Sequence, residues 1–461
     1  NTITGNEGYA VSATAREDST IDSLTVLRNE ITMNGNTVTN VGGGIEILRE
    51  GNSSISSALP GMRGINIVDN MINDNVGIGV HLRAIGGGDQ TLLYNVLGNE
   101  IMRSGLQGML IESEHDAVMD IDVIGNWISE NGFDGIFYDG LDFASITGTW
   151  AMNTITANGQ NLTIPDVVTA SMNVDILDTD MGDDEIGEGG GTFVFSSAVG
   201  GNGIYFNGNV GFNIDPMAPL DANLIEDRLI LAENIFDGNR LDGVDIWMNG
   251  GAFLADFVDN EFTNNFINGL DIFGTGALID LVFTGNLVGV DAHDVARANG
   301  GDGVEIQNAD GFFDIFMAEN TIEYNGTDKV DPMITGGRGI DFLNKESGQS
   351  TLTVVGNDIS NNWFTGAYIM NTSSPDQLQF GPDDPLDADG DVSQIPITHL
   401  HFIENNVDGN GLVGPLDPPG AGNFGFGANP LLFGLAIRVG TATGFFITTA
   451  DLLNPNGYPD G

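Results

Sequence analysis

A pattern anchored on asparagine recurs along the sequence and constrains the fold more than any other feature. Counted from an anchor Asn, an apolar residue stands at +2, Asn at +5, Gly at +9, and apolar residues at +10 and +12. In one copy, Asn126 is followed by Ile128, Asn131, Gly135 and Ile136. The same spacing fits without gaps from other anchors, with Ser104 replacing the second Asn in one of them: Asn70, Asn99, Asn234, Asn260 and Asn357. Self-similarity at a fixed period indicates a repeat architecture.

Alternating apolar residues predict three short strands in each repeat. Apolar residues at −5 and −3 before the anchor, as at Ile121 and Val123, add a third period-2 segment to those near +2 and +10. Gly and Asn lie between the segments, and they supply the positive φ angles of tight turns. Anchors at 99, 126 and 153, and at 234, 260 and 286, are 26 or 27 residues apart. Such a period predicts one coil of a solenoid, and stacked coils bury a continuous core.

The repeat length decides between solenoid and propeller. A propeller blade needs ~40 to 50 residues and four strands, which this period cannot hold. On these motifs the chain resembles the right-handed parallel β-helices of the pectate-lyase-like superfamily over nearly its whole length. The resemblance implies an all-β, single-stranded parallel β-helix with inward apolar stacks and turn Asn residues hydrogen-bonded from coil to coil. That superfamily includes polysaccharide lyases, glycoside hydrolases, phage tailspikes and surface adhesins, so the resemblance leaves the function open.

Interruptions of the repeat predict where loops enter a single β-helix domain over 1–461. The anchors Asn153 and Asn234 are 81 residues apart, which fits two degenerate coils or one long excursion. The motif is missing between them, and this favours the excursion. Smaller insertions follow Asn286 and Asn320 in the same turn, so we expect them on one side of the coils. The larger predicted insertions are a long loop at 159–202, an Asp-rich loop at 371–397 and a C-terminal insertion with the last coil or cap at 411–461.

The charge balance is strongly acidic. The chain has 13 Lys and Arg against 65 Asp and Glu, a net charge of −52. Nucleic acids and anionic membranes bind through Lys and Arg, which excludes both as partners. No run of about 18 to 20 apolar residues predicts a membrane span. The 41% of hydrophobic residues can fill a sizeable core, and the lack of Cys excludes disulfides and thiolate metal sites. Four sequons would permit glycosylation of a secreted protein: Asn52, Asn161, Asn325 and Asn371.

A row of outward side chains is the first candidate site. Positions +10 and +12 point inward, so +11 points outward. Four carboxylates fall in this +11 row, at Asp245, Asp271, Glu305 and Asp341. In-register stacking would bring neighbours to about 4.8 Å, and hard oxygen ligands in a row suit Ca²⁺. The alternative is a solvated acidic stripe. The other members of the row are Glu46, His81, Leu110, Phe137, Tyr205 and Tyr368.

An Asp-rich loop is the second candidate calcium site. Asp387, Asp389 and Asp391 alternate around a Gly turn, so one loop could wrap one Ca²⁺. The loop is not an EF-hand, because Val392 stands where that motif has Gly and Thr398 where it has Glu. A solvated loop is the alternative reading. Calcium is the only cofactor that the sequence suggests.

Signals for catalysis are sparse. The segment Gly182-Asp183-Asp184 resembles the paired-Asp segment of polygalacturonase-type hydrolases. It lies in the long insertion, however, and the Gly-His-Gly and Arg-x-Lys companions of that family are missing. Lyase chemistry on an anionic polysaccharide needs a base and a cation. Near the acidic residues of the +11 row, the available basic residues are Arg338, Lys329 and Lys345.

Histidines and outward aromatic residues give two further candidates. His399 and His401 share one face of a third strand, where they would form a metal or acid–base pair or simply a surface pair. Outward aromatics could stack sugar rings, although scattered aromatics are common on large proteins. The outward aromatics are Trp127, Phe137, Trp247 and Tyr368, whereas the Phe residues expected in the core are Phe236, Phe257, Phe262 and Phe283.

The beginning of the repeat and the acidity shape the functional prediction. The motif starts at Asn1 with no polar cap, and an uncapped coil exposes apolar core and strand edges. We therefore expect covalent continuation or coverage by another molecule, and a head-to-tail contact would make filaments. The sequence predicts an extracellular or cell-surface structural or adhesive module in a saline, calcium-containing medium, with itself or a polysaccharide as partner. The alternatives are a secreted polysaccharide lyase or glycoside hydrolase, and a phage or host-attachment spike.

Overall fold

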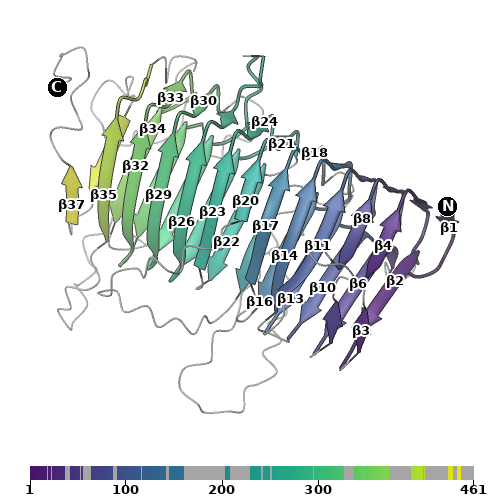
Figure 1. Cartoon of the computed structure of the whole chain (residues 1–461). Coiled ribbons are helices and arrows are strands. Elements are labelled where there is room, and N and C mark those ends of the chain that lie inside the picture. The colour runs from purple at the N-terminus through teal and green to yellow at the C-terminus, as the bar shows by residue number, and fades with distance from the viewer. Residues whose placement is uncertain are drawn as a thin grey trace. The chain divides into compact units, whose positions relative to one another are not determined.

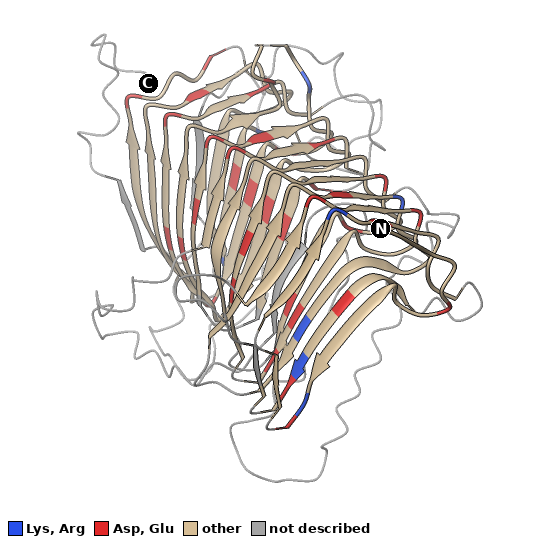
Figure 2. Ribbon diagram, turned by 45° about the vertical axis from the view of Figure 1, so that its right-hand side comes forward, with Lys and Arg blue, Asp and Glu red and all other residues tan. Residues whose placement is uncertain are grey.

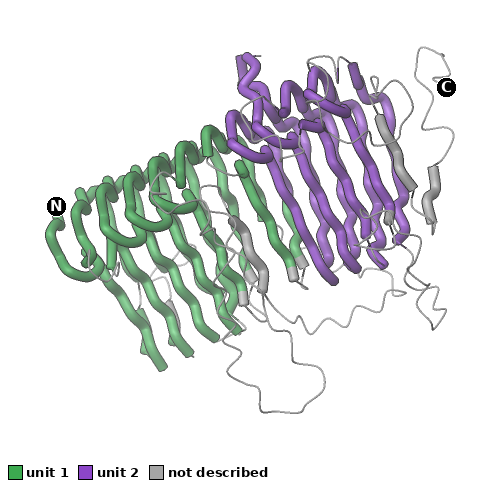
Figure 3. Tube along the Cα trace, turned by 180° about the vertical axis from the view of Figure 1, so that it is seen from behind, with its two compact units in different colours: residues 1–255 green, residues 256–461 purple. Residues whose placement is uncertain are grey.

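The computed structural model describes most of the chain, and all its regular elements there are β-strands (Figure 1). The chain divides into two compact units, unit 1 (Asn1–Ala255) and unit 2 (Asp256–Gly461) (Figure 3). The residues described are 1–17, 19–21, 23–36, 42–51, 53–55, 64–86, 91–115, 117–141, 145–159, 203–207, 229–239, 242–249, 252–293, 295–326, 337–345, 347–372, 396–408, 410, 435–439 and 444–447.

Each coil of unit 1 gives one strand to each of three parallel sheets. The first sheet holds the short strands that follow the anchors: β1 (Thr2–Thr4), β5 (Glu30–Thr32), β9 (Met71–Asn73), β12 (Glu100–Met102), β15 (Trp127–Ser129), β18 (Thr154–Thr156) and β21 (Ile235–Asp237). The second sheet holds β2 (Val11–Ala15), β6 (Gly43–Glu50), β10 (Ile78–Ile85), β13 (Met109–Glu114), β16 (Ile136–Leu141), β19 (Gly203–Asn207) and β22 (Val244–Asn249). The third sheet holds β4 (Leu24–Leu27), β8 (Ile65–Val68), β11 (Thr91–Leu97), β14 (Val118–Ile124), β17 (Ser145–Ala151) and β20 (Leu229–Ala232). A side pair joins β3 (Thr20–Ile21) to β7 (Ser54–Ile55).

Unit 2 repeats this arrangement, and β23 (Ala252–Val258) contains the boundary between the units. Its first sheet holds β24 (Glu261–Thr263), β27 (Leu287–Val288), β30 (Thr321–Glu323) and β33 (Asp358–Ser360). Its second sheet holds β25 (Leu270–Thr275), β28 (Val304–Ala309), β31 (Ile340–Lys345), β34 (Ala367–Thr372) and β36 (Leu435–Val439). Its third sheet holds β26 (Leu278–Thr284), β29 (Phe312–Ala318), β32 (Gln349–Val355), β35 (Ile397–Ile403) and β37 (Gly444–Ile447). The prediction of an all-β parallel β-helix with three strands per coil is confirmed.

The long gap between Asn153 and Asn234 adds no strand to the first sheet among the described residues. Thr154 of β18 pairs directly with Ile235 of β21, so no further coil lies between these strands in the first sheet. The predicted last coil also has strands, because β36 pairs with β34 and β37 with β35. The loops themselves fall largely outside the described residues, at 160–202, 373–395 and 411–434.

Two ladders of buried asparagine amides connect the coils. In unit 1, the Asn126 Oδ1 atom accepts hydrogen bonds from the backbone N–H and the Nδ2 of Asn99, at 2.9 and 3.0 Å. Its own Nδ2 donates to the Val96 carbonyl at 2.8 Å and to Asn153 Oδ1 at 3.0 Å. All four hydrogen-bonding positions of this amide are therefore used. The second ladder, at +5, links Asn131 to Asn158 in the same way.

The Gly at +9 is required by the close approach of successive coils. A Cβ atom on Gly108 would lie 2.6 Å from Asn131 Nδ2 and 2.7 Å from the Gly135 carbonyl oxygen. Any side chain there would push the ladder and the next coil away. Inside the coils, the predicted Phe core is confirmed, since Phe257, Phe262 and Phe283 are fully buried with ring centroids 5.8 to 6.4 Å apart.

The positive φ angles fall only partly where the sequence predicted. The ladder Asn residues do not adopt them; positive φ occurs one residue before most ladder positions, at −1 and +4, but not before Asn299, which follows an insertion. Gly98 and Gly125 occupy two of these sites, but Arg103, Glu130 and Met152 occupy others. The prediction is confirmed for the turn glycines but was wrong for the ladder Asn residues. Stacked hydrogen bonds hold the backbone left-handed at the preceding residue even where its type disfavours this conformation.

Two of the four sequons are inaccessible in the fold. Asn325 belongs to the second ladder and is fully buried, with Nδ2 donating to Asn362 Oδ1 at 2.9 Å. Asn371 is also fully buried, and its Nδ2 donates to the Pro396 carbonyl at 2.8 Å. A glycan on either nitrogen would remove a buried hydrogen bond and could not be accommodated. Asn52 and Asn161 lie outside the described residues.

Truncating one ladder amide should destabilise the stack. We expect Asn126→Ala to lower the free energy of unfolding by at least about 2 kcal/mol, because it leaves buried donors and acceptors on both neighbouring coils without partners. Urea unfolding measures the loss. The matched control is Asn95→Ala, whose amide lies on the outer face of the third sheet and, among the described residues, donates to Asn66 Oδ1 alone. Equal losses in the two variants would contradict the structural role of the ladder.

Candidate functional site

The second sheet of unit 2 carries the acidic part of the +11 row. Asp271 of β25 pairs with Glu305 of β28, Glu305 with Asp341 of β31, and Asp341 with Tyr368 of β34. The predicted register of these residues is confirmed. Figure 2 shows acidic residues recurring from strand to strand, with basic residues few among them.

The row differs from the prediction in unit 1. Phe137 pairs with Gly203, and Gly203 pairs with Asp245, so Gly203 occupies the row where we placed Tyr205. Tyr205 lies two residues farther on, opposite Asp139. A slip of two residues keeps every side chain on its face, so the apolar pattern alone could not fix the register after a long insertion. Asp245 itself is buried.

Two amide side chains donate hydrogen bonds to Glu305, and a lysine donates to one of these amides. Its Oε2 accepts from Asn268 Nδ2 at 3.0 Å and its Oε1 from Gln307 Nε2 at 2.5 Å. The Gln307 Oε1 atom in turn accepts from Lys345 Nζ at 2.8 Å. Lys345, one of the three basic residues named from the sequence, therefore reaches the row through Gln307. Lys329 lies outside the described residues.

Arg338 is the basic residue in direct contact with the row. Its guanidinium forms an ion pair with Asp341, and its Cζ lies 4.5 Å from the centroid of the Tyr368 ring. Burial acts to lower the pKa of Arg338, but the charges of Asp341 and Asp302 outweigh it and raise that pKa. The guanidinium is thus a permanent positive charge held between two acids and an aromatic face.

Asp302 is the residue of this site that the sequence did not reveal. Its buried Oδ1 accepts from the backbone N–H of Gly337 at 2.6 Å and of Arg338 at 2.5 Å, which fixes the entry to β31. Its own N–H donates to Asn268 Oδ1 at 2.8 Å. An available signal was its place directly before the motif Gly, Gly303. Asp134 and Asp242 are also followed by Gly and buried.

Two carboxyl groups of the site titrate near neutrality. Burial, together with the charges of Asp341 and Glu305, raises the pKa of Asp302 to about 7 against the opposing charge of Arg338. Burial also raises the pKa of Asp341 to about 6, with Arg338 opposing and Glu305 adding to the shift. Acids that exchange protons close to pH 7 beside a fixed cation are suited to general acid–base chemistry.

The calcium prediction for the row stays a prediction. Glu305 and Asp341 bond protein donors, and the charge of Arg338 already lies against Asp341. Within the described ranges, no group of three or more His, Asp or Glu side chains is arranged to hold a metal ion. Asp387, Asp389 and Asp391 lie outside those ranges, as do Asp183 and Asp184.

The histidine pair and the outward aromatics are only partly as predicted. His399 and His401 lie on β35 opposite Thr351 and Thr353, on one face as expected. Phe137, expected to be exposed, is only 9% accessible and packs against Leu110 and Trp247. Tyr368 lies beneath Arg338, whereas Trp127 is largely exposed, as predicted.

A second polar cluster, on the second sheet of unit 1, surrounds His81 of the +11 row. His81 Nε2 lies 2.6 Å from Glu112 Oε2, and Nδ1 lies 3.2 Å from the Tyr9 hydroxyl. Burial acts to raise the pKa of Glu112, but the hydrogen bond and charge of His81, with Arg83, lower it overall. Burial and the charges of Glu46 and Glu112 raise the pKa of Tyr9. The cluster ties the first coil to the third and fourth.

Comparisons of the chain with protein-family models, curated proteins and solved structures found no match. The fold assignment therefore rests on the strand register and the ladders. The described part of the chain has no helix with the length and apolarity needed to cross a membrane.

The raised carboxyl pKa values predict an unusual pH dependence. Between about pH 4 and pH 7 the folded site retains protons that the unfolded chain releases, so these groups favour folding at low pH and lose that contribution as the pH rises. We expect Asp302→Asn, which keeps the accepting oxygen, to remove a pH-dependent contribution on the order of a few kcal/mol. Urea unfolding across this pH range measures it. Asp341→Asn should remove only the share of the pH-dependent stability that is lost by about pH 6. If the free energy of unfolding changed with pH equally in the parent protein and in both variants, the raised pKa values would be refuted.

Proposed function

We propose that the chain is an extracellular or cell-surface structural or adhesive β-helix module. The observation that carries this proposal is the pair of buried Asn ladders, which bond every coil of a unit to the next. Such stacking gives a stiff support whose outer faces are free to vary, and that is what a structural or adhesive module requires.

The acidity supports an extracellular, saline and calcium-containing setting. A net charge of −52 produces self-repulsion that dissolved salt screens over about 10 Å. We propose that calcium bound by acidic residues, including the Asp387–Asp391 loop and the +11 row, links or stabilises copies of the chain. A chain that presents stacked strands can associate end to end with a second copy.

Electron microscopy of the purified chain with calcium and then with a chelator tests this function. We expect filaments or sheets with calcium and their loss with the chelator, because divalent cations bridge carboxylates that otherwise repel. A variant with Asp387, Asp389 and Asp391 changed to Asn should assemble less. Discrete particles in both conditions would contradict the self-assembly proposal.

A second candidate function is supported by the Arg338 cluster. If the chain shares more than its fold with the pectate-lyase-like superfamily, the second sheet of unit 2 would hold a polysaccharide lyase or glycoside hydrolase site. Arg338 would neutralise an acidic sugar, and Asp341, with a pKa raised to about 6 by burial, would transfer a proton. Asp302 would act as a positioning residue through its bonds to the Arg338 backbone.

A substrate assay distinguishes the second function from the first. The assay follows ultraviolet absorbance of unsaturated uronates, and new reducing ends, from alginate- and pectin-like polymers. If the chain is such an enzyme, we expect product from the parent protein and a loss of at least about a hundredfold in Asp341→Asn. Asp280→Asn, on the third sheet of the same unit, is the control. Absence of product from the parent protein would leave only the structural function.

A further inference from the structure

The outer face of the first sheet in unit 1 carries a line of side chains that lies outside the two polar clusters described above. The residue at +1 of each coil points outward, and the strands pair in register from β1 to β21. The line, named here the Trp127 row, is Thr2, Glu30, Met71, Glu100, Trp127, Thr154 and Ile235. Six strand spacings separate its ends, a length of about 29 Å.

Exposed apolar side chains recur at every second strand of the Trp127 row. Met71 is 46% exposed, Trp127 55% and Ile235 37%, while the polar residues Glu100 and Thr154 lie between them. Apolar contacts thus repeat at roughly 9.6 Å, with hydrogen-bonding groups in the intervals. Solvent-facing side chains of this size are more often scattered singly, whereas these three lie in one register.

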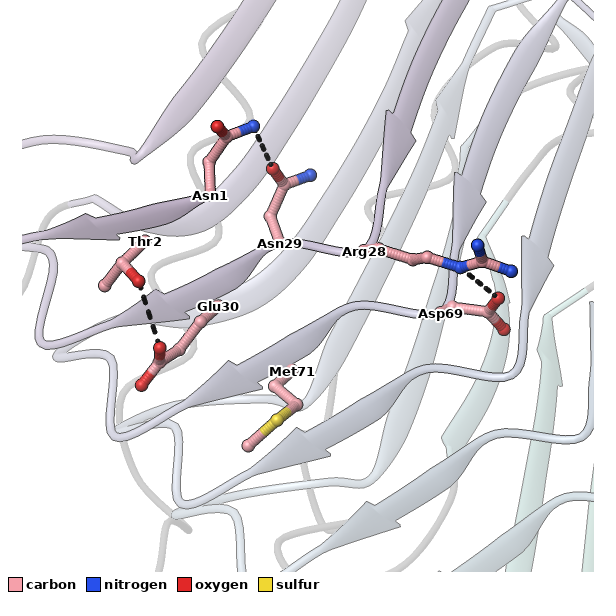
Figure 4. Close-up of a pocket in the computed structure, with 7 residues that line it drawn as sticks. All are labelled: Asn1, Thr2, Arg28, Asn29, Glu30, Asp69 and Met71. Atoms are coloured by element: carbon pink, nitrogen blue, oxygen red, sulfur yellow. Dashed lines mark hydrogen bonds and ion pairs between the residues drawn. The ribbon is translucent and has the colours of Figure 1, made fainter.

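A pocket of about 340 Å³ lies at one end of the Trp127 row (Figure 4). Thr2, Glu30 and Met71 line it, together with an ion pair between Arg28 Nε and Asp69 Oδ2 at 3.3 Å. The Thr2 hydroxyl donates to Glu30 Oε2 at 3.1 Å. The hollow therefore combines one apolar side chain with several hydroxyl-binding groups.

A cluster of charged groups lies in the turn that follows the middle strands of the row. Arg103 binds Asp74 through two hydrogen bonds, at 2.7 and 3.0 Å, and lies 4.0 Å from Glu130 Oε2. The residue before anchor Asn126 is Gly125, where a Cβ atom would meet nothing within 4 Å. The Trp127 side chain is more than half exposed.

We propose that the Trp127 row and its pocket bind a linear neutral polysaccharide, with Trp127 as the stacking platform. Alternate rings of an extended β-1,4-linked glycan present the same face, which matches apolar contacts at every second strand. The carboxylates of Glu30 and Glu100, and the guanidinium of Arg103, offer partners for the sugar hydroxyls. The charge of −52 disfavours a polyanion on this face. The inference rests on the adhesive function proposed above and names its ligand class.

Affinity electrophoresis in gels containing hydroxyethyl cellulose, glucomannan or alginate tests the proposal. We expect the neutral polymers to retard the full chain and alginate not to. Trp127→Ala should weaken retardation by at least about tenfold in Kd, since truncating a central aromatic contact costs more than 1.4 kcal/mol. Trp127→Phe should retain most of the binding. The control is Phe266→Ala in unit 2, which removes an aromatic residue of similar exposure, 46%.

A second readout uses tryptophan fluorescence. Trp150 is buried and Trp247 and Trp363 are partly buried, so Trp127 should dominate quenching by acrylamide. Cellohexaose should protect it. The site assignment is overturned if neutral polymers do not retard the chain, or if Trp127→Ala binds them as the parent does. The assignment of the Trp127 row is also overturned if Trp127→Ala alters self-association but leaves glycan binding intact. Sedimentation without glycan measures the self-association. Trp127-dependent binding by a chain that never forms filaments would uphold the inference and refute only self-assembly.

Discussion

Hydrogen bonding along the stack, from each side-chain amide to the next coil, is the interaction on which the rest of this structure depends. An Asn at a ladder position offers two donors and two acceptor positions, and Asn126 uses all of them with groups on two neighbouring coils. Each amide is satisfied only if the next coil presents its own Asn in register. Ser104 illustrates the constraint, because its buried hydroxyl makes no hydrogen bond among the described residues. The strictness of the sequence repeat follows from this geometry.

The ladders and the inward apolar stacks do not use the side chains on the outer faces of the sheets. The charged and aromatic side chains of the candidate sites lie on these faces. Few cations are available in a chain with 13 Lys and Arg, and several are placed against carboxylates of neighbouring coils, as in the pairs of Arg103 with Asp74 and Arg28 with Asp69. Arg338 is enclosed more deeply, between Asp341 and Tyr368. These outer faces differ in character. The second sheet of unit 2 holds the buried charge cluster around Arg338, whereas the first sheet of unit 1 holds the exposed Trp127 row.

The acidic row shows how far stacking alone predicts a site. Asp271, Glu305 and Asp341 could be aligned from the repeat because consecutive coils contribute equivalent positions. Their chemistry could not be predicted in the same way. The pKa of Asp341 is raised by burial, and burial depends on Arg338, Tyr368 and the strand entry held by Asp302, none of which the spacing places in contact.

The sequence by itself determined the fold class, the three strands per coil and the inward Phe stack, because each depends on residues at a fixed period. Only the tertiary structure decided the positions of positive φ, the place of Gly203 opposite Asp245, and the burial of Phe137 and Asn371. These features arise where one coil meets another after an insertion or at a turn. There the free energy depends on packing and hydrogen-bond partners that lie dozens of residues away, and periodicity carries no information about them.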